Sequence, residues 1–160
     1  MSALLDAFAS SFQALPCRDA AGLADSRRAA LADALRDGLP HARSEAWKYT
    51  PLRSLERRDF ASSDPTPAVF DPGMLAAIPS PRIVFVNGRH DPAHSDLSGL
   101  PEGVCLLPLS QVLKSSDARE SNFLARRFDR ADEVFARLNA ALADEGMVLR
   151  AHAGAHASAP

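Results

Sequence analysis

Four histidines are the residues of this sequence that most invite a metal-binding hypothesis. His90 and His94 are four residues apart, and so are His152 and His156. On a helix this spacing places two imidazoles on one face, where they can share a metal ion. Neither pair lies in a predicted helix, so exposed loop histidines are the simpler interpretation. A metal-dependent enzyme that uses His90, His94 and Asp91 stays an alternative.

Other patterns that carry chemistry are missing from the sequence. It contains no Gly-x-Ser-x-Gly motif for a nucleophilic serine, and its eight glycines form no phosphate-binding loop. The acidic pairs at 132–133 and 144–145 flank a predicted helix, where solvation explains them. We therefore expect a chain that is not an enzyme and has no catalytic residue, no bound metal and no cofactor of its own.

The remaining candidate is a basic and aromatic segment at residues 41–58. Five basic residues stand there against two acidic ones, a net charge of +3: Arg43, Lys48, Arg53, Arg57 and Arg58 against Glu45 and Glu56. Trp47 and Tyr49, the chain's only tryptophan and tyrosine, lie among them. Such a segment can bind nucleic acid by stacking bases and holding phosphates. Alternatively, Trp47 is a core anchor and the arginines line a solvated or partner-facing rim.

Hydrophobic periodicity predicts the helices that position this segment. Apolar residues at spacings of three and four predict a helix over 4–15, and a second helix is expected at about 25–37. Asp25 or Ser26 should cap its start and Gly38 its end. Helical spacing returns at 123–128 and at 134–142, with Gly146 as the final cap.

Strands and loops occupy the middle and the end of the chain. The run 82–88 predicts a strand covered on both faces and closed by an Asn-Gly turn, and further strands are expected at 104–107 and 147–152. Pro108 should open a short helix that reaches Lys114. Residues 61–73 are rich in proline and predict a loop. The last strand has no successor, which favours a natural protein that continues.

Composition limits the class of protein. The 160 residues have the size of one domain, and a net charge of −2 disfavours a strongly basic nucleic-acid binder. Cys17 and Cys105 are far apart, so a disulfide framework is not expected. The first residues do not resemble a signal peptide, and no apolar run is long enough to span a bilayer. We therefore expect a cytoplasmic protein.

The segment that begins at Gly38 resembles the N-terminal signature of the SufB/SufD family, and within it of the SufD scaffolds that assemble iron–sulfur clusters in the bacterial SUF system. The matching residues are Gly38, Leu39, Pro40, Arg43, Glu45, Trp47, Lys48, Tyr49, Thr50 and Leu52. The stretches 84–104 and 135–146 are similar to later parts of the same region.

This resemblance implies an α+β, mostly helical N-terminal domain with a few short strands, from which the family's parallel β-helix core is absent. The expected domain is 1–146, with a strand region at about 82–107, while 147–160 begin the missing core or form a frayed tail. The implied function is that of a non-catalytic scaffold working through protein–protein contacts. The implied partners are a SufB-like sister scaffold and a SufC-like ATPase. From Arg43 to Leu52 the signature residues would serve structure or partner contact, and no catalytic role is carried over.

Overall fold

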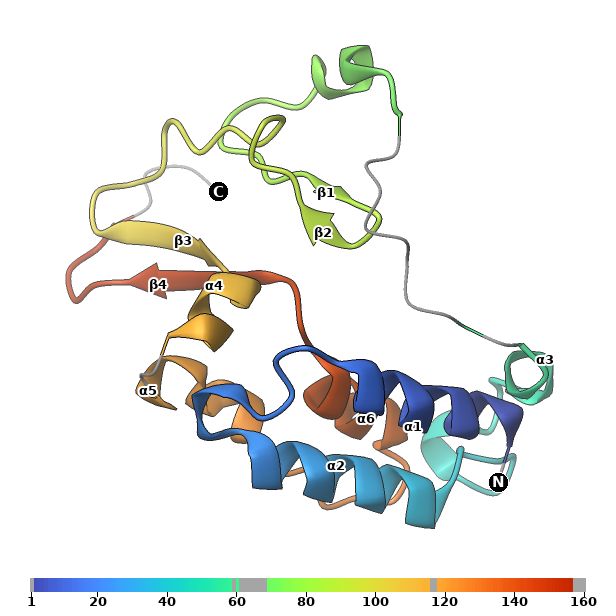
Figure 1. Ribbon diagram of the computed structural model, residues 1–160. Coiled ribbons are helices and arrows are strands. Elements are labelled where there is room, and N and C mark those ends of the chain that lie inside the picture. The colour runs from blue at the N-terminus through green and yellow to red at the C-terminus, as the bar shows by residue number, and fades with distance from the viewer. Residues whose placement is uncertain (1, 59, 61–68, 116–117, 157–160) are drawn as a thin grey trace. The chain divides into compact units, whose positions relative to one another are not determined.

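The computed structural model describes residues 2–58, 60, 69–115 and 118–156, and it divides the chain into two units (Figure 1). The first comprises Met1–Ser62 and Leu113–Asp144, and the second comprises Ser63–Val112 and Glu145–Pro160. Each unit is built from segments distant in sequence. The predicted mostly helical α+β class is confirmed.

Three helices form the core of the first unit: α1 (Ala3–Ala14), α2 (Ala24–Asp37) and α6 (Val134–Leu142), with α6 in contact with both others (Figure 1). Their apolar faces meet in one buried cluster, as the periodicity predicts. The cluster consists of Leu5, Phe12, Leu31, Ala34, Val134, Leu138 and Ala141.

The helix ends agree with prediction in part. Ser2 caps α1 by accepting a hydrogen bond from the backbone N–H of Leu5. Gly38 ends α2 at a φ of +72°, where a residue with a Cβ would be strained. The predicted cap of α2 at Asp25 or Ser26 is wrong. A 3₁₀ turn, η1 (Ala20–Gly22), runs directly into the helix, and the Ser26 hydroxyl donates back to the Leu23 carbonyl.

Two arginines fasten α2 to the C-terminal part of this unit. Arg27 is fully buried and donates from Nη2 to the Ala143 carbonyl at 2.6 Å. Burial lowers its pKa, and the nearby Asp144 charge opposes that effect. Arg137, 3% exposed, pairs with Asp37 and donates to the Phe128 carbonyl at 2.9 Å.

The predicted helix at 123–128 is wrong. Only α5 (Ala118–Ser121) and a 3₁₀ turn, η4 (Asn122–Ala125), form there, and the chain is extended at Arg126. Phe123 is 54% exposed and therefore does not join the core. The buried Arg137 guanidinium instead binds the Phe128 carbonyl, a contact from nine residues further along the chain that ties this stretch to α6.

The second unit contains two small antiparallel sheets, drawn in Figure 1. Strands β1 (Phe85–Val86) and β2 (Arg89–His90) form a hairpin around Asn87 and Gly88. Both turn residues have positive φ, as predicted for an Asn-Gly turn. The prediction of a strand covered on both faces is wrong, since Phe85 is 41% exposed and the strand spans two residues.

The other sheet pairs β3 (Val104–Pro108) with β4 (Met147–Ala151) over five residue pairs. The final strand therefore has a partner within this chain, and its continuation into a β-helix stays a prediction. Helix α4 (Leu109–Lys114) follows β3 as expected, and a 3₁₀ turn, η3 (Pro72–Leu75), ends the described part of the proline-rich loop. Residues 61–68 of that loop lie outside the described residues.

The predicted cap at Gly146 is also wrong. Helix α6 ends at Leu142, and the N–H of Ala143 bonds to the Asn139 carbonyl. Gly146 lies four residues further on, where its carbonyl accepts from the N–H of Leu109 at 2.9 Å at the start of β4. It joins the strand to the sheet instead of ending the helix.

Candidate interaction surface

Residues 41–58, here called the signature segment, follow α2 as a chain of tight turns. Successive turn hydrogen bonds run from the N–H of Ser44 to the His41 carbonyl, from Trp47 to Ser44 and from Thr50 to Trp47, at 2.8–2.9 Å. They build the 3₁₀ turn η2 (Glu45–Trp47), and a single helical turn, α3 (Arg53–Glu56), comes after Pro51. As predicted, the proline keeps Thr50 out of a helix.

Trp47 anchors this segment to the helical unit. Its indole Nε1 donates to the Asp132 carbonyl at 3.1 Å, and its ring centroid lies 5.2 Å from that of Phe135 in a tilted contact. Phe135 in turn packs against the α1–α2–α6 core. Trp47 is half-buried, so the predicted inward orientation is confirmed while full burial is not reached.

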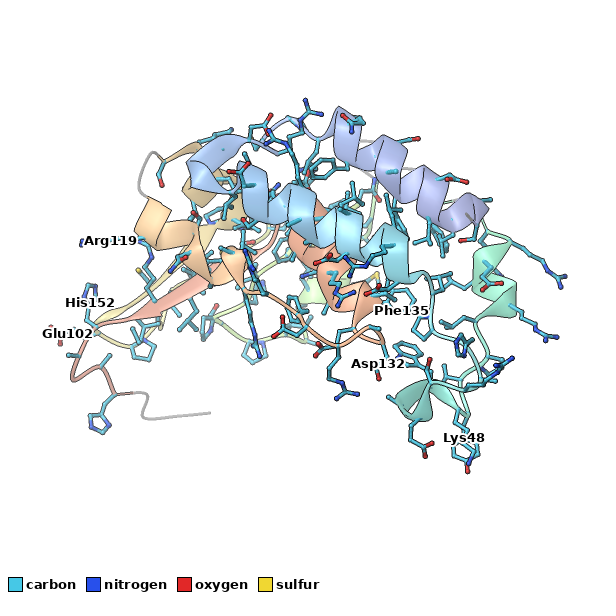
Figure 2. The ribbon with its side chains drawn as sticks, turned by 90° about the horizontal axis from the view of Figure 1, so that it is seen from below. Lys48, Glu102, Arg119, Asp132, Phe135 and His152 are labelled. Atoms are coloured by element: carbon cyan, nitrogen blue, oxygen red, sulfur yellow. The ribbon has the colours of Figure 1, made fainter. Side chains whose placement is uncertain are left out.

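The other side chains of the signature point mainly to solvent. Arg43, Glu45, Lys48, Tyr49 and Thr50 are all exposed, whereas Leu52 is half-buried. Tyr49 is 88% exposed, with the Lys48 ammonium 5.5 Å from its ring centroid. Figure 2 shows Lys48 on the outer side of the segment and Asp132 and Phe135 on its inner side. The segment thus has an anchored inner face and a polar, aromatic outer face.

The cations of the segment form no ion pair with any of the acidic residues that the structure describes. These cations are Arg43, Lys48, Arg53, Arg57 and Arg58. Other arginines of the same unit do pair with aspartates: Arg18, Arg28, Arg36, Arg130 and Arg137. The positive charge of the segment is therefore displayed to solvent.

A shallow pocket of about 310 Å³ lies at the start of the segment. Gly38, Pro40 and His41 line one part of it, and Arg130 and Asp132 line another. The Arg130 guanidinium holds the Asp132 carboxylate at 2.7 Å, which raises the pKa of Arg130 and fixes this wall. The pocket has both polar and apolar lining residues, and it ends at Ser44 within the segment.

Asp132 and Phe135, which receive Trp47, are the residues that sequence reasoning missed. Asp132 was assigned to solvation at a helix start, but its backbone carbonyl binds a side chain 85 residues away. No local pattern predicts a contact over that separation. The apolar spacing at 134–142 identified Phe135 as a helix residue without revealing its aromatic partner.

The first histidine pair belongs to a hydrogen-bonded turn. His94 Nδ1 lies 2.7 Å from the Asp91 carboxylate, and this contact is the main cause that lowers the pKa of Asp91. His90 Nε2 lies 3.3 Å from the Ser95 hydroxyl, and the His94 ring packs edge-on against Phe70. These contacts give both rings a structural role in the turn.

The second histidine pair lies at the surface of the second unit, and both cysteines are free. His152 and His156 are exposed, and both line a shallow pocket of about 400 Å³ with Glu102. Cys17 and Cys105 are free and half-buried. Among the described residues, no three histidine, cysteine or acidic side chains gather in an arrangement that could hold a metal ion.

The structure gives the nucleic-acid alternative no support from Trp47. Stacking of bases needs exposed aromatic faces, but the Trp47 ring lies against Phe135 and its N–H is already bonded. Tyr49 is then the one aromatic side chain within 41–58 that is free to meet a ligand.

No helix in the part of the chain that the structure describes has both the length and the apolar character to cross a bilayer. What the fold defines is a helix-dominated α+β domain with one anchored, outward-facing signature segment. Residues 1–159 match the family described as the SufBD protein N-terminal region, and the chain belongs to that family.

Two relatives carry related names. An iron–sulfur cluster assembly SufBD family protein of Synechocystis sp. is 29% identical over 106 residues, covering 64% of this chain and 23% of that protein. The iron–sulfur cluster assembly protein SufD of Escherichia coli is 44% identical over 64 residues, covering 39% of this chain and 15% of that protein. The chain thus matches less than a quarter of the length of either relative.

Proposed function

We propose that this chain is a non-catalytic scaffold domain of a SufD-like protein and takes part in iron–sulfur cluster assembly through protein–protein contacts. Support comes from the family match over residues 1–159 and from the names of the two relatives. The observation that carries a contact role is the exposure of Arg43, Lys48 and Tyr49 on an anchored segment. Arginine and tyrosine are enriched where proteins bind one another.

The proposed partners are a SufB-like sister scaffold and a SufC-like ATPase, which the full-length protein would meet in the cytoplasm. In this proposal the chain itself works without a bound cofactor or metal. Its signature residues from Arg43 to Leu52 serve structure, through Trp47 and Leu52, and partner contact, through the exposed members.

Co-purification tests the proposal. The tagged full-length protein is co-expressed with the SufB-like and SufC-like proteins of the same organism and isolated without oxygen. We expect all three polypeptides in one complex after size-exclusion chromatography. Recovery of the tagged protein alone under these conditions, or turnover of a small molecule by this chain, would contradict the proposed function.

A further inference from the structure

We propose that the exposed cations of the signature segment bind an acidic surface of a partner protein in the cluster-assembly complex. The inference rests on the proposed function and adds two points to it. The residues of this chain that make the contact are the five cations of the segment, Arg57 and Arg58 among them. The partner offers clustered carboxylates.

Positive charge is concentrated in the signature segment. The signature segment holds five basic and two acidic residues, whereas the rest of the chain holds 13 basic and 18 acidic ones. The segment is therefore at +3 and the remainder at −5. A segment of net positive charge in an otherwise acidic protein attracts anions and steers an acidic partner toward it.

The five cations of the segment are available for contacts outside the chain. All five are exposed, and none joins an ion pair in the described ranges, whereas Arg36 and Arg130 are held by aspartates. An arginine that is not engaged inside its own fold keeps its full set of donors for an outside carboxylate, which it can bind with two parallel hydrogen bonds. The patch is thus equipped for an acidic partner.

The backbone of the signature segment is ordered before a partner binds. Trp47 ties the turns around Arg43 and Lys48 to Asp132 and Phe135, and Arg57 follows the helical turn α3, so these side chains project from structured backbone. Binding then costs less ordering than it would for an unstructured basic tail. The pocket lined by Pro40, His41 and Arg130 gives the partner a concave feature at the start of the segment.

Two features favour a protein over a nucleic acid. Glu45 is exposed and Glu56 is half-buried, and both place negative charge inside the patch, where a phosphate backbone would be repelled. Tyr49 alone is left for stacking, since the Trp47 ring packs on Phe135. A folded acidic surface can place its carboxylates between these glutamates, whereas a phosphate backbone has a charge at every step.

The test compares two matched charge reversals in the full-length protein. Arg57→Glu with Arg58→Glu changes the signature segment, and Arg126→Glu with Arg127→Glu changes another exposed arginine pair outside it. Binding to the purified, immobilised SufB-like scaffold and SufC-like ATPase is measured by biolayer interferometry at about 50 and about 300 mM NaCl. Thermal melts establish that both variants are folded.

We expect the Arg57/Arg58 reversal to weaken binding to at least one of the two proteins by about tenfold or more at low salt, and the difference to shrink at high salt. The Arg126/Arg127 reversal should bind like the wild type. Equal affinity of both variants, or equal loss in both, would overturn the inference while leaving the proposed function intact.

The two remaining outcomes are also decisive. A wild-type protein that binds neither partner overturns the proposed function and this inference together. A 20-nucleotide RNA or a DNA duplex serves as a further probe. If the Arg57/Arg58 reversal abolishes nucleic-acid binding and spares both proteins, the patch is a nucleic-acid site and the inference is wrong.

Discussion

Arginines of the α2–α6 pair and arginines of the signature segment show two uses of one residue type within a single unit. Arg137 is buried, bonds the Phe128 carbonyl and pairs with Asp37. Arg57 and Arg58 are exposed and unpaired within the described residues. The first kind holds helices together, and the second kind contributes little to the fold. The comparison separates the residues that build this domain from those that it displays.

Trp47 connects the two regions. Its inner contacts belong to the helical unit, and its immediate neighbours Lys48 and Tyr49 face solvent. A signature motif can therefore combine structural residues with several exposed ones. We predict that substitutions in this motif fall into two groups, those that unfold the domain and those that leave it folded but alter binding.

The largest effect is expected in the helical core. Leu138 is 4% exposed in the cluster of α1, α2 and α6, so Leu138→Ala should lower the free energy of unfolding by about 2–5 kcal/mol. Urea unfolding followed by circular dichroism measures this value. Phe123→Ala is the control, because Phe123 is 54% exposed and its loss should change stability little. An equal cost for both would mean that the core is misplaced.

A smaller loss is expected at the anchor. Full burial of Trp47 would predict a cost of about 3–5 kcal/mol for Trp47→Ala, but the ring is half-buried. We expect about 2 kcal/mol from lost ring contact and the lost hydrogen bond. Trp47→Phe keeps a ring on Phe135 and should cost about 1 kcal/mol. Stability equal to the wild type in both variants would contradict the anchoring role.

Acid should weaken the helical region through Asp37. Hydrogen bonds from Arg36 and then from Arg137 lower the pKa of Asp37 below its ordinary 3.8. A carboxylate whose pKa is lower in the folded state stabilises the fold at pH values above its unfolded-state pKa. This contribution is lost as pH falls through the folded-state pKa. Unfolding measured from pH 7 down to pH 2 should therefore show a steeper acid loss in the wild type than in Asp37→Asn.

Asp25→Asn is the control for this pH dependence, because Asp25 pairs only with the exposed Arg28 at 3.1 Å and its own carboxylate is fully exposed. The unfolding free energy of this variant should fall with decreasing pH as steeply as that of the wild type. If Asp37→Asn does so as well, the ion pair between α2 and α6 contributes nothing to acid stability.

The smallest effect on stability is expected for the exposed Arg57 and Arg58. Reversal of Arg57 and Arg58 breaks no ion pair among the described residues, so the free energy of unfolding should change by no more than about 0.5 kcal/mol. Urea unfolding of this variant beside the wild type measures it. A loss comparable to that of Leu138→Ala would show that these arginines are structural.

Local signals predicted a large part of the fold. The apolar spacing of α1 and α6 and the Asn87-Gly88 turn each depend on residues close in sequence, and each is confirmed. The family signature was also visible, because Gly38 to Leu52 is one continuous motif.

Contacts between distant residues could not be predicted in the same way. After η4 the Phe128 carbonyl bonds the Arg137 side chain, and β4 pairs with β3, which lies more than 30 residues earlier. The contact of Trp47 with Asp132 joins residues that are 85 positions apart in the sequence. For the same reason the sequence alone identified the signature residues but not which of them are exposed.

The claim that the exposed residues of the signature segment contact a partner protein has one most direct test. This test is the affinity of a full-length Tyr49→Ala variant for the SufB-like and SufC-like proteins. Tyr49 is 88% exposed, so the variant should keep the wild-type melting temperature. It should bind at least one of these proteins roughly tenfold more weakly, as expected when an aromatic interface residue is removed. Wild-type affinity for both proteins, or a melting temperature lowered as far as that of Leu138→Ala, would contradict the account.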